Sequence, residues 1–220
     1  MPTAPYYIQV DGKKVRVPGT TTVIGRFKES GGLIHWAWNI GIEGKDYRDV
    51  RDSAGGSGTM AHEMVERSIR GEKDPTKRDE DWGDVEYPLA VQAYEAYEKW
   101  ASMSKLEIVD TEMHLVSNEF RFGGTPDAVG YVNGEFCLLD WKTGNKLYSD
   151  SLIQLSCYAH LWNFHNPDAQ LTGGFHLCRF SKDHADFHHH HFSELDDAWE
   201  AFKLMRKLYD LDKVLKKRAA

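Results

Sequence analysis

Alternation of hydrophobic and polar positions predicts β-strands in three regions of the chain, because side chains on a strand point alternately to its two faces. Residues 7–17 alternate on both sides of Asp11-Gly12, which predicts an N-terminal hairpin. One strand is expected over 107–116, and an antiparallel pair over 171–179 and 185–192. The last range contains four consecutive histidines, whose rings should be divided between the two faces of the strand. A metal-binding tract and an expression tag are the alternatives, which this internal, strand-like position disfavours.

Apolar residues at helical spacing predict the helices that separate these strands. They are expected over 26–42, from 46 to the glycine cluster at 55–58, over 59–69 with Thr59 as N-cap, over 87–104, from 150 onward and from 193 onward. We place Trp36 and Trp38 in the core, with stacking on unpaired bases as the alternative. On the final helix, Phe202, Met205 and Leu208 should face inward.

The most informative stretch is a predicted hairpin between Gly123 and Thr143. Its centre is Asn133-Gly134, a pair that tolerates the positive φ angles which a type I′ turn requires at both positions. A two-residue turn fixes the register, so the expected partners are Tyr131 with Phe136, Val129 with Leu138 and Asp127 with Asp140. Two carboxylates should therefore face each other across the ladder.

The charged face of this hairpin is a candidate site. Lys142 shares the face of Asp140, because it lies two residues further along the strand. Like charges directly opposite each other destabilise a sheet, so their presence indicates a positively charged ligand, most simply a divalent cation. The other face carries Ala128, Leu139 and Trp141 and should pack on the core, leaving the charged face for chemistry. A solvated hairpin with incidental charges is the alternative.

Several stretches together resemble a known family. Gly124-Thr125-Pro126-Asp127, a spacer over 128–139 and then Asp140-Trp141-Lys142 match the motif of the PD-(D/E)XK nucleases. The helix with Gly58-x-x-x-His62, and Gln154 with Tyr158 one turn later, resemble the RecB-like exonuclease branch of that superfamily. The resemblance implies an α/β fold with a restriction-endonuclease-like core, in which helices flank a mixed central β-sheet. It covers nearly the whole chain as one domain, with an N-terminal hairpin and helices in 1–105 and the catalytic core in 106–220.

The resemblance also implies a metal site and a basic catalytic group. Asp127 and Asp140 would hold Mg²⁺ or Mn²⁺, helped by His62 and the backbone carbonyl of Trp141. Lys142 would orient or deprotonate the attacking water and offset negative charge in the transition state. A lone histidine on a helix is more often structural, so the role of His62 depends on the resemblance.

Three further residues have roles implied by the same resemblance. Gln154 and Tyr158 are four residues apart, so both project from one helix face, where they would position the strand beside the scissile phosphate. Glu112 would assist a metal ion, since the branch places an acid on the strand before the Pro-Asp motif. Helix packing for the pair, and a surface position for Glu112, are the alternatives.

Composition permits this function without requiring it. The net charge of −7 and the pI of about 5.9 weigh against a protein that coats nucleic acid indiscriminately, although the excess acid is concentrated in residues 71–86, an expected surface loop. Three widely spaced cysteines favour reduced core thiols and are too few for the iron–sulfur cluster of some RecB-like relatives. The chain has no apolar run long enough for a membrane span and no signal-peptide pattern, which predicts a cytoplasmic protein.

We therefore expect a metal-dependent DNA exonuclease that acts on single-stranded or duplex ends in repair, recombination or processing, of phage or bacterial type. A structure- or sequence-specific endonuclease is the nearest alternative, but restriction-type members usually lack the His62 helix and the Gln154/Tyr158 pair. A catalytically silent nucleic-acid-binding module on the same fold is the other alternative. The complete set of Asp127, Asp140 and Lys142 argues against it.

Overall fold

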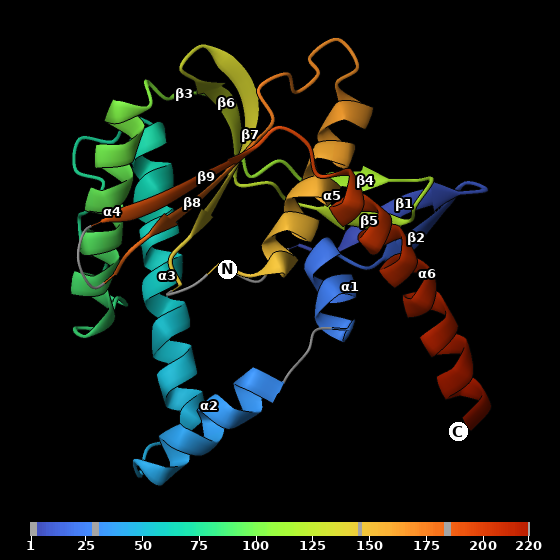
Figure 1. Cartoon of the computed structure of the whole chain (residues 1–220), viewed down its shortest axis with the longest axis horizontal. Helices are drawn as coiled ribbons and strands as arrows, with labels where there is room; N and C mark the ends of the chain where they lie inside the picture. Colours follow the sequence, from blue (N-terminus) through green and yellow to red (C-terminus); the bar gives the residue numbers. More distant parts are fainter. Residues whose placement is uncertain (1–3, 28–30, 145–146, 183–185, 220) are drawn as a thin grey trace.

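The computed structural model describes residues 4–27, 31–144, 147–182 and 186–219, which form nine strands and six helices (Figure 1). The strands are β1 (Tyr6–Val10), β2 (Lys13–Val17), β3 (Glu107–Thr111), β4 (Leu115–Ser117), β5 (Phe122–Gly124), β6 (Ala128–Val132), β7 (Glu135–Lys142), β8 (Phe175–Phe180) and β9 (Phe187–Phe192). The helices are α1 (Thr20–Phe27), α2 (Gly31–Ile42), α3 (Tyr47–Ile69), α4 (Glu86–Met103), α5 (Ser149–His165) and α6 (Asp196–Ala219).

Five strands form the central sheet in the order β3-β6-β7-β8-β9. β7 and β8 run parallel and are connected through α5, whereas the other neighbours are antiparallel. The β6–β7 hairpin turns at Asn133 (φ 52°) and Gly134 (φ 88°). It pairs Tyr131 with Phe136 and Val129 with Leu138, so the predicted register is confirmed. The mixed central sheet flanked by helices confirms the predicted fold class.

Helices cover both faces of this sheet (Figure 1). On one face, Leu139 and Trp141 pack with the buried side chains of α3 and α4; the rings of Trp141 and Trp100 lie 5.5 Å apart. On the other face, Val129 and Leu138 pack with buried side chains of α5 and α6. The face of Asp140 is therefore also core along most of β7. Only the last residues of the strand remain for chemistry, which corrects the expectation of a whole free face.

The N-terminal hairpin β1–β2 packs on the short β4–β5 pair, which in turn contacts α5, away from α3 and α4 (Figure 1). This layer is fastened to the residues just before Asp127. The N–H of Gly123 donates to the carbonyl of Pro18 at 3.0 Å, and Thr20 Oγ1 donates to the carbonyl of Gly123 at 3.0 Å. The start of the chain is thus held next to the glycines that lead into the hairpin.

The helices of the N-terminal half differ from the prediction in two ways. The stretch predicted as one helix over 26–42 contains the end of α1 and the whole of α2, and the residues between them, 28–30, lie outside the described ranges. The glycine cluster 55–58 does not interrupt a helix, because α3 continues from Tyr47 to Ile69 with Asp46 as its N-cap. Thr59 is therefore no cap: its Oγ1 donates to the carbonyl of Gly55 at 3.1 Å inside the helix.

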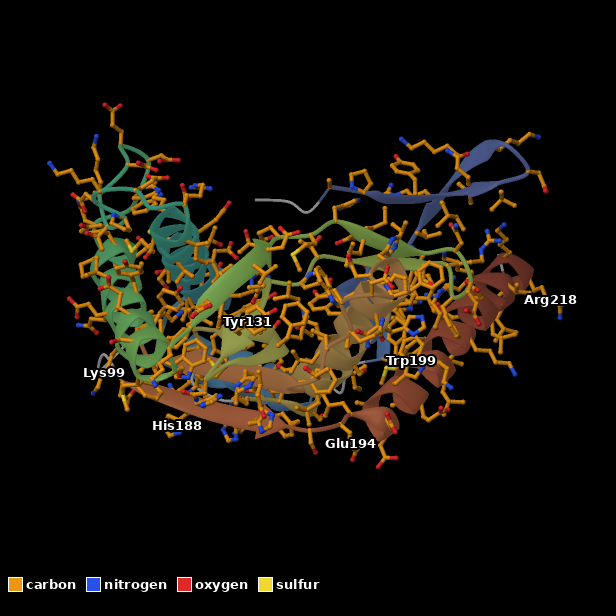
Figure 2. The ribbon with its side chains drawn as sticks, turned by 90° about the horizontal axis from the view of Figure 1, so that it is seen from above. Lys99, Tyr131, His188, Glu194, Trp199 and Arg218 are labelled. Atoms are coloured by element: carbon orange, nitrogen blue, oxygen red, sulfur yellow. The ribbon has the colours of Figure 1, made fainter. Side chains whose placement is uncertain are left out.

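Some of the predicted core side chains on α2 and α6 are exposed. α2 projects from the body of the molecule (Figure 1) and has no buried residue, and Trp38 is 67% exposed, so the core prediction for the α2 tryptophans is wrong. On α6, Phe202 is fully buried and Met205 packs against the core, whereas Leu208 is 47% exposed because it lies on the outer side of the helix with Leu204 and Leu211. Figure 2 shows Trp199 beside the body and Arg218 at the projecting end of this helix.

The predicted strands are interrupted or shortened where tertiary contacts intervene. The strand expected over 107–116 breaks after β3 at Glu112, which has φ 50°. At the β9 edge, the histidine run is divided as predicted: His189 and His191 contact His176, and His190 stacks on Phe192. Figure 2 shows His188 on this outer edge. Among the described residues, no helix has the length and apolar character needed to cross a membrane.

Candidate active site

Asp127 and Asp140 lie next to each other at the open end of the β6–β7 hairpin. Asp127 directly precedes β6, and its Oδ2 accepts a hydrogen bond of 2.7 Å from the backbone N–H of Trp141. Asp140, on β7, is fully buried, and its Oδ1 has no hydrogen-bond partner among the described residues. The paired ladder ends at Ala128 with Leu139, one residue before the two aspartates, and Asp127 is close enough for its charge to act on Asp140.

Burial makes this pair of acids easy to protonate. It raises the pKa of Asp127, and it raises the pKa of Asp140 to about 6 with a further contribution from the negative charge of Asp127. Lys142 opposes both shifts. A positive charge placed between the two acids would therefore relieve a destabilising arrangement.

Lys142 supplies part of that positive charge. Its ammonium forms a salt bridge with Asp140 Oδ2, and its side chain remains 28% exposed. Burial alone would lower the pKa of Lys142, but the charges of Asp140 and Asp127 together raise it. Lys142 is therefore an ammonium at neutral pH, placed between a buried carboxylate and solvent.

His62 reaches the hairpin from α3, which packs closely on the end of β7. A Cβ at Gly58 would lie 2.7 Å from Thr143 Oγ1, so any larger residue one helical turn before His62 would force Thr143 or the helix to shift. Burial and the nearby positive charge of Lys142 lower the pKa of His62 to about 4. The charge of Asp140 and a hydrogen bond to the backbone of Trp141 oppose this shift but are smaller effects. The imidazole is neutral at pH 7, as a metal ligand must be.

Glu112 stands at the break between β3 and β4. Its N–H donates to the carbonyl of Asp127 at 3.1 Å, which holds the residue beside the aspartate despite its strained positive φ. Glu112 is exposed as a residue, but partial desolvation of its carboxyl group raises its pKa to about 7, helped by the charges of Asp127 and Glu66. This carboxyl group is therefore close to half protonated at neutral pH, and a cation nearby would ionise it.

Gln154 and Tyr158 project from one face of α5, as predicted, and Gln154 Nε2 donates to the hydroxyl of Tyr158 at 2.7 Å. Tyr158 is buried against the glycine pair, since a Cβ at Gly124 would lie 2.6 Å from its ring. Burial raises the pKa of Tyr158 well above its ordinary value, so it remains a neutral phenol that can donate a hydrogen bond.

Most of these side chains line one cavity of about 840 Å³. Of the predicted residues, it is lined by His62, Glu112, Asp127, Gln154 and Tyr158. Asp140, Trp141 and Lys142 are not among its lining residues, although the adjacent Thr143 is. It is also lined by residues for which no role was predicted, among them Tyr6, Thr20, Thr21, Glu66, His114 and Thr125. The sequence signal for these additional lining residues is the pair Gly123-Gly124. Adjacent glycines indicate that another part of the chain lies close to the backbone there, but they do not identify that part.

The donor set fits a hard divalent cation. Two carboxylates, an imidazole and the carbonyl of Trp141 are ligands that Mg²⁺ and Mn²⁺ accept, and a buried carboxylate oxygen without a partner is available. No three His, Cys, Asp or Glu side chains of the described ranges already form a complete cage. Binding would therefore require Asp127 and Asp140 to exchange their present partners for the ion.

The three cysteines are free and buried within the hydrophobic cores.

Metal binding should depend on pH through Asp140. Because folding raises the pKa of Asp140 to about 6, the metal-free protein should lose stability as the pH rises from about 4 to above 6, where the buried group ionises. Binding a cation needs the ionised form, so added Mg²⁺ or Mn²⁺ should raise the melting temperature by about 5–10 °C at about pH 7.5, at about a hundredfold excess over Kd. At about pH 5 the shift should fall to about half, because protonation of Asp140 weakens cation binding about tenfold there. Thermal melts at both pH values test this, and a shift of equal size at the two would contradict it.

A scan against family models matches residues 18–217 to the PD-(D/E)XK nuclease superfamily. The matched range includes the hairpin with Asp127 and Asp140, the helix that carries His62, and α5 with its Gln154/Tyr158 pair. A search of curated proteins gives no match.

Proposed function

The chain belongs to the PD-(D/E)XK nuclease superfamily, and from that premise we propose that it is a divalent-metal-dependent DNA exonuclease of the RecB-like branch. The superfamily makes it a nuclease with a restriction-endonuclease-like fold that binds DNA and, typically for such enzymes, uses a divalent metal. The exonuclease activity, the choice of Mg²⁺ or Mn²⁺, and a role in phage or bacterial repair, recombination or processing are the proposal.

One observation carries the proposal: His62 of α3 lies beside the Asp127/Asp140 pair of the hairpin. These residues are far apart in the sequence, and a tight glycine contact brings their elements together. The resemblance to RecB-like nucleases rests on this same histidine helix and on the Gln154/Tyr158 pair. A restriction-type endonuclease would need neither feature.

The chemistry follows from the charges of the residues. A bound divalent cation would lower the pKa of a water molecule and neutralise charge on the phosphate. Asp127 and Asp140 would hold that cation, with His62 and the carbonyl of Trp141. Lys142, an ammonium at neutral pH, would orient the water and stabilise charge that develops on the phosphate. Tyr158 and Gln154 would hydrogen-bond the DNA strand from the cavity wall. Glu112 would assist the cation from the same wall.

The deciding experiment compares linear and circular DNA. End-labelled linear molecules and covalently closed or circular single-stranded molecules are incubated with Mg²⁺, Mn²⁺ or EDTA. Progressive shortening of linear DNA, with circles intact and with no reaction in EDTA, is the expected result. Cleaved circles would replace the exonuclease by an endonuclease. Binding of DNA without hydrolysis under any metal would favour a catalytically silent module.

His62→Ala should change the metal requirement more than the maximal rate. The variant loses one neutral nitrogen ligand, so the metal concentration for half-maximal activity should rise roughly tenfold or more, with partial rescue by excess Mn²⁺. Activity titrated against each metal measures this. His188→Ala, on the exposed β9 edge (Figure 2), is the control and should leave the titration unchanged. Equal loss at every metal concentration would mean that His62 is only structural.

A further inference from the structure

Two aromatic rings are stacked on each other in the wall of the active-site cavity. Tyr6, at the start of β1, and His114, in the segment between β3 and β4, have ring centroids 4.4 Å apart and planes inclined by only 7°. Both residues line the cavity together with Asp127 and Tyr158. The proposed chemistry uses neither ring.

Tyr6 is fixed in place by the backbone next to the site. A Cβ at Gly123 would lie 2.1 Å from Tyr6 Cδ1, so the ring packs directly on the glycine backbone. The Tyr6 hydroxyl and Thr125 Oγ1 form a hydrogen bond of 2.9 Å, two residues before Asp127. The ring is 8% exposed. Tyr6 is therefore a rigid base, tied to the turn that carries Asp127.

His114 is exposed, in contrast to Tyr6. One face of its imidazole is covered by Tyr6, and the residue borders the cavity. A flat ring supported from behind and open in front can accept a further flat ring. Stacking of bases on aromatic side chains, histidine included, is a general means of holding unpaired nucleotides, and it tolerates any sequence because every base has a π-face.

We propose that the Tyr6–His114 stack is a base-binding subsite, which receives the unpaired base of a nucleotide next to the cleaved phosphate. This inference rests on the proposed function, because it takes DNA to be the occupant of the cavity. It also narrows the substrate, since a base can stack there only after it has left its own duplex. The substrate class is thus DNA with at least one unpaired nucleotide at the site.

Another exposed aromatic offers a comparison. Trp38 on α2 is 67% exposed and could stack on a base, but it does not line the cavity, and among the described residues its ring has no aromatic partner. Phe164, near the end of α5, is 52% exposed and also lies outside the lining. Phe164→Ala is therefore a matched control for loss of an exposed ring.

The test uses His114→Ala, His114→Phe and Phe164→Ala on a single-stranded oligonucleotide. His114→Ala should reduce kcat/KM about fivefold to 100-fold, mainly through KM, whereas His114→Phe, which stacks but cannot ionise, should stay within about threefold of the wild type. Phe164→Ala should behave as wild type. If His114→Phe is as impaired as His114→Ala, the imidazole acts through its charge or hydrogen bonds, and the stacking proposal is wrong.

A scan of abasic sites identifies the nucleotide. Moving one abasic residue along the oligonucleotide should reduce wild-type activity at one position near the cleaved bond, and His114→Ala should lose nothing further there, because the contact is already absent. If both proteins lose activity equally at every position, the subsite is refuted.

A binding measurement in EDTA separates the subsite from catalysis. A single-stranded probe with 2-aminopurine at the position identified should be quenched on binding to the wild type and to His114→Phe, but less by His114→Ala. Quenching without hydrolysis under any metal would refute the proposed nuclease activity and keep the subsite. Hydrolysis with equal quenching by all three proteins would refute the subsite and keep the proposed nuclease activity.

Discussion

Asp140→Asn should abolish both hydrolysis and metal-induced stabilisation while leaving the fold intact. Asparagine has nearly the same shape and removes only the charge, and Asp140 is the buried carboxylate on which Lys142 and the proposed cation converge. Activity should fall by about 10³-fold or more, since loss of the cation removes activation of the water and charge neutralisation together. Hydrolysis of end-labelled DNA and titration calorimetry with Mn²⁺ measure the two losses.

The thermal stability of the metal-free Asp140→Asn variant tests whether its loss of activity is due to unfolding. Because burial raises the pKa of Asp140, the ionised group opposes folding at neutral pH, so the metal-free variant should be at least as stable as the metal-free wild type. Asp168→Asn, at an exposed position after α5, should change nothing. An Asp140→Asn protein that binds Mn²⁺ normally would show that Asp140 is not a ligand.

The local geometry of the site was predictable from a few residues. Asn133-Gly134 fixes a two-residue turn, the turn fixes the register, and the period of two along a strand places Lys142 on the side of Asp140. Each step depends on neighbouring residues only. The helix predicted over 87–104 likewise follows from local spacing, and α4 spans Glu86–Met103.

Predictions failed where distant residues decide the local structure. The glycines at 55–58 are typical of a helix break, yet α3 continues through them, and Gly58 is needed for the close approach to Thr143, more than eighty residues away in the sequence. The helix thereby delivers His62 to the hairpin. A glycine that local propensity identifies as a breaker is here a packing residue of the site.

The position of Glu112 could not be obtained from strand periodicity either. Alternation predicts a continuous strand over 107–116, but the chain turns at Glu112 with a positive φ, and its N–H bonds to the carbonyl of Asp127. That contact exists only once β3 has paired with β6. The contribution of the N-terminal Tyr6 was missed for the same reason, since its partners are Gly123, Thr125 and His114.

Substitution of Lys142 should affect the chemical step while leaving folding and metal binding nearly unchanged. The site holds it as an ammonium, because the two aspartates raise its pKa against the effect of burial. In the proposed mechanism, its role at neutral pH is therefore to orient water and to stabilise negative charge, in preference to removing a proton. Lys142→Arg keeps the charge and should retain part of the activity, whereas Lys142→Met keeps the apolar stem and loses the charge.

Lys142→Met should fold and bind DNA nearly as before, since one phosphate contact among several is lost. Metal should still bind at about pH 8: loss of the ammonium raises the pKa of both carboxyl groups, but the bound cation itself would favour their ionised forms. Hydrolysis should nevertheless fall by about 10²-fold or more, the usual scale for loss of a group that stabilises charge in the transition state. Single-turnover cleavage at saturating metal measures this step, with Lys13→Ala on the exposed N-terminal hairpin as the control. Among the described residues, no other cationic side chain contacts Asp140, so no other residue could replace Lys142 in this role. A Lys142→Met protein that cleaves at close to the wild-type rate would therefore refute the mechanism, whatever the metal affinities of the aspartate variants.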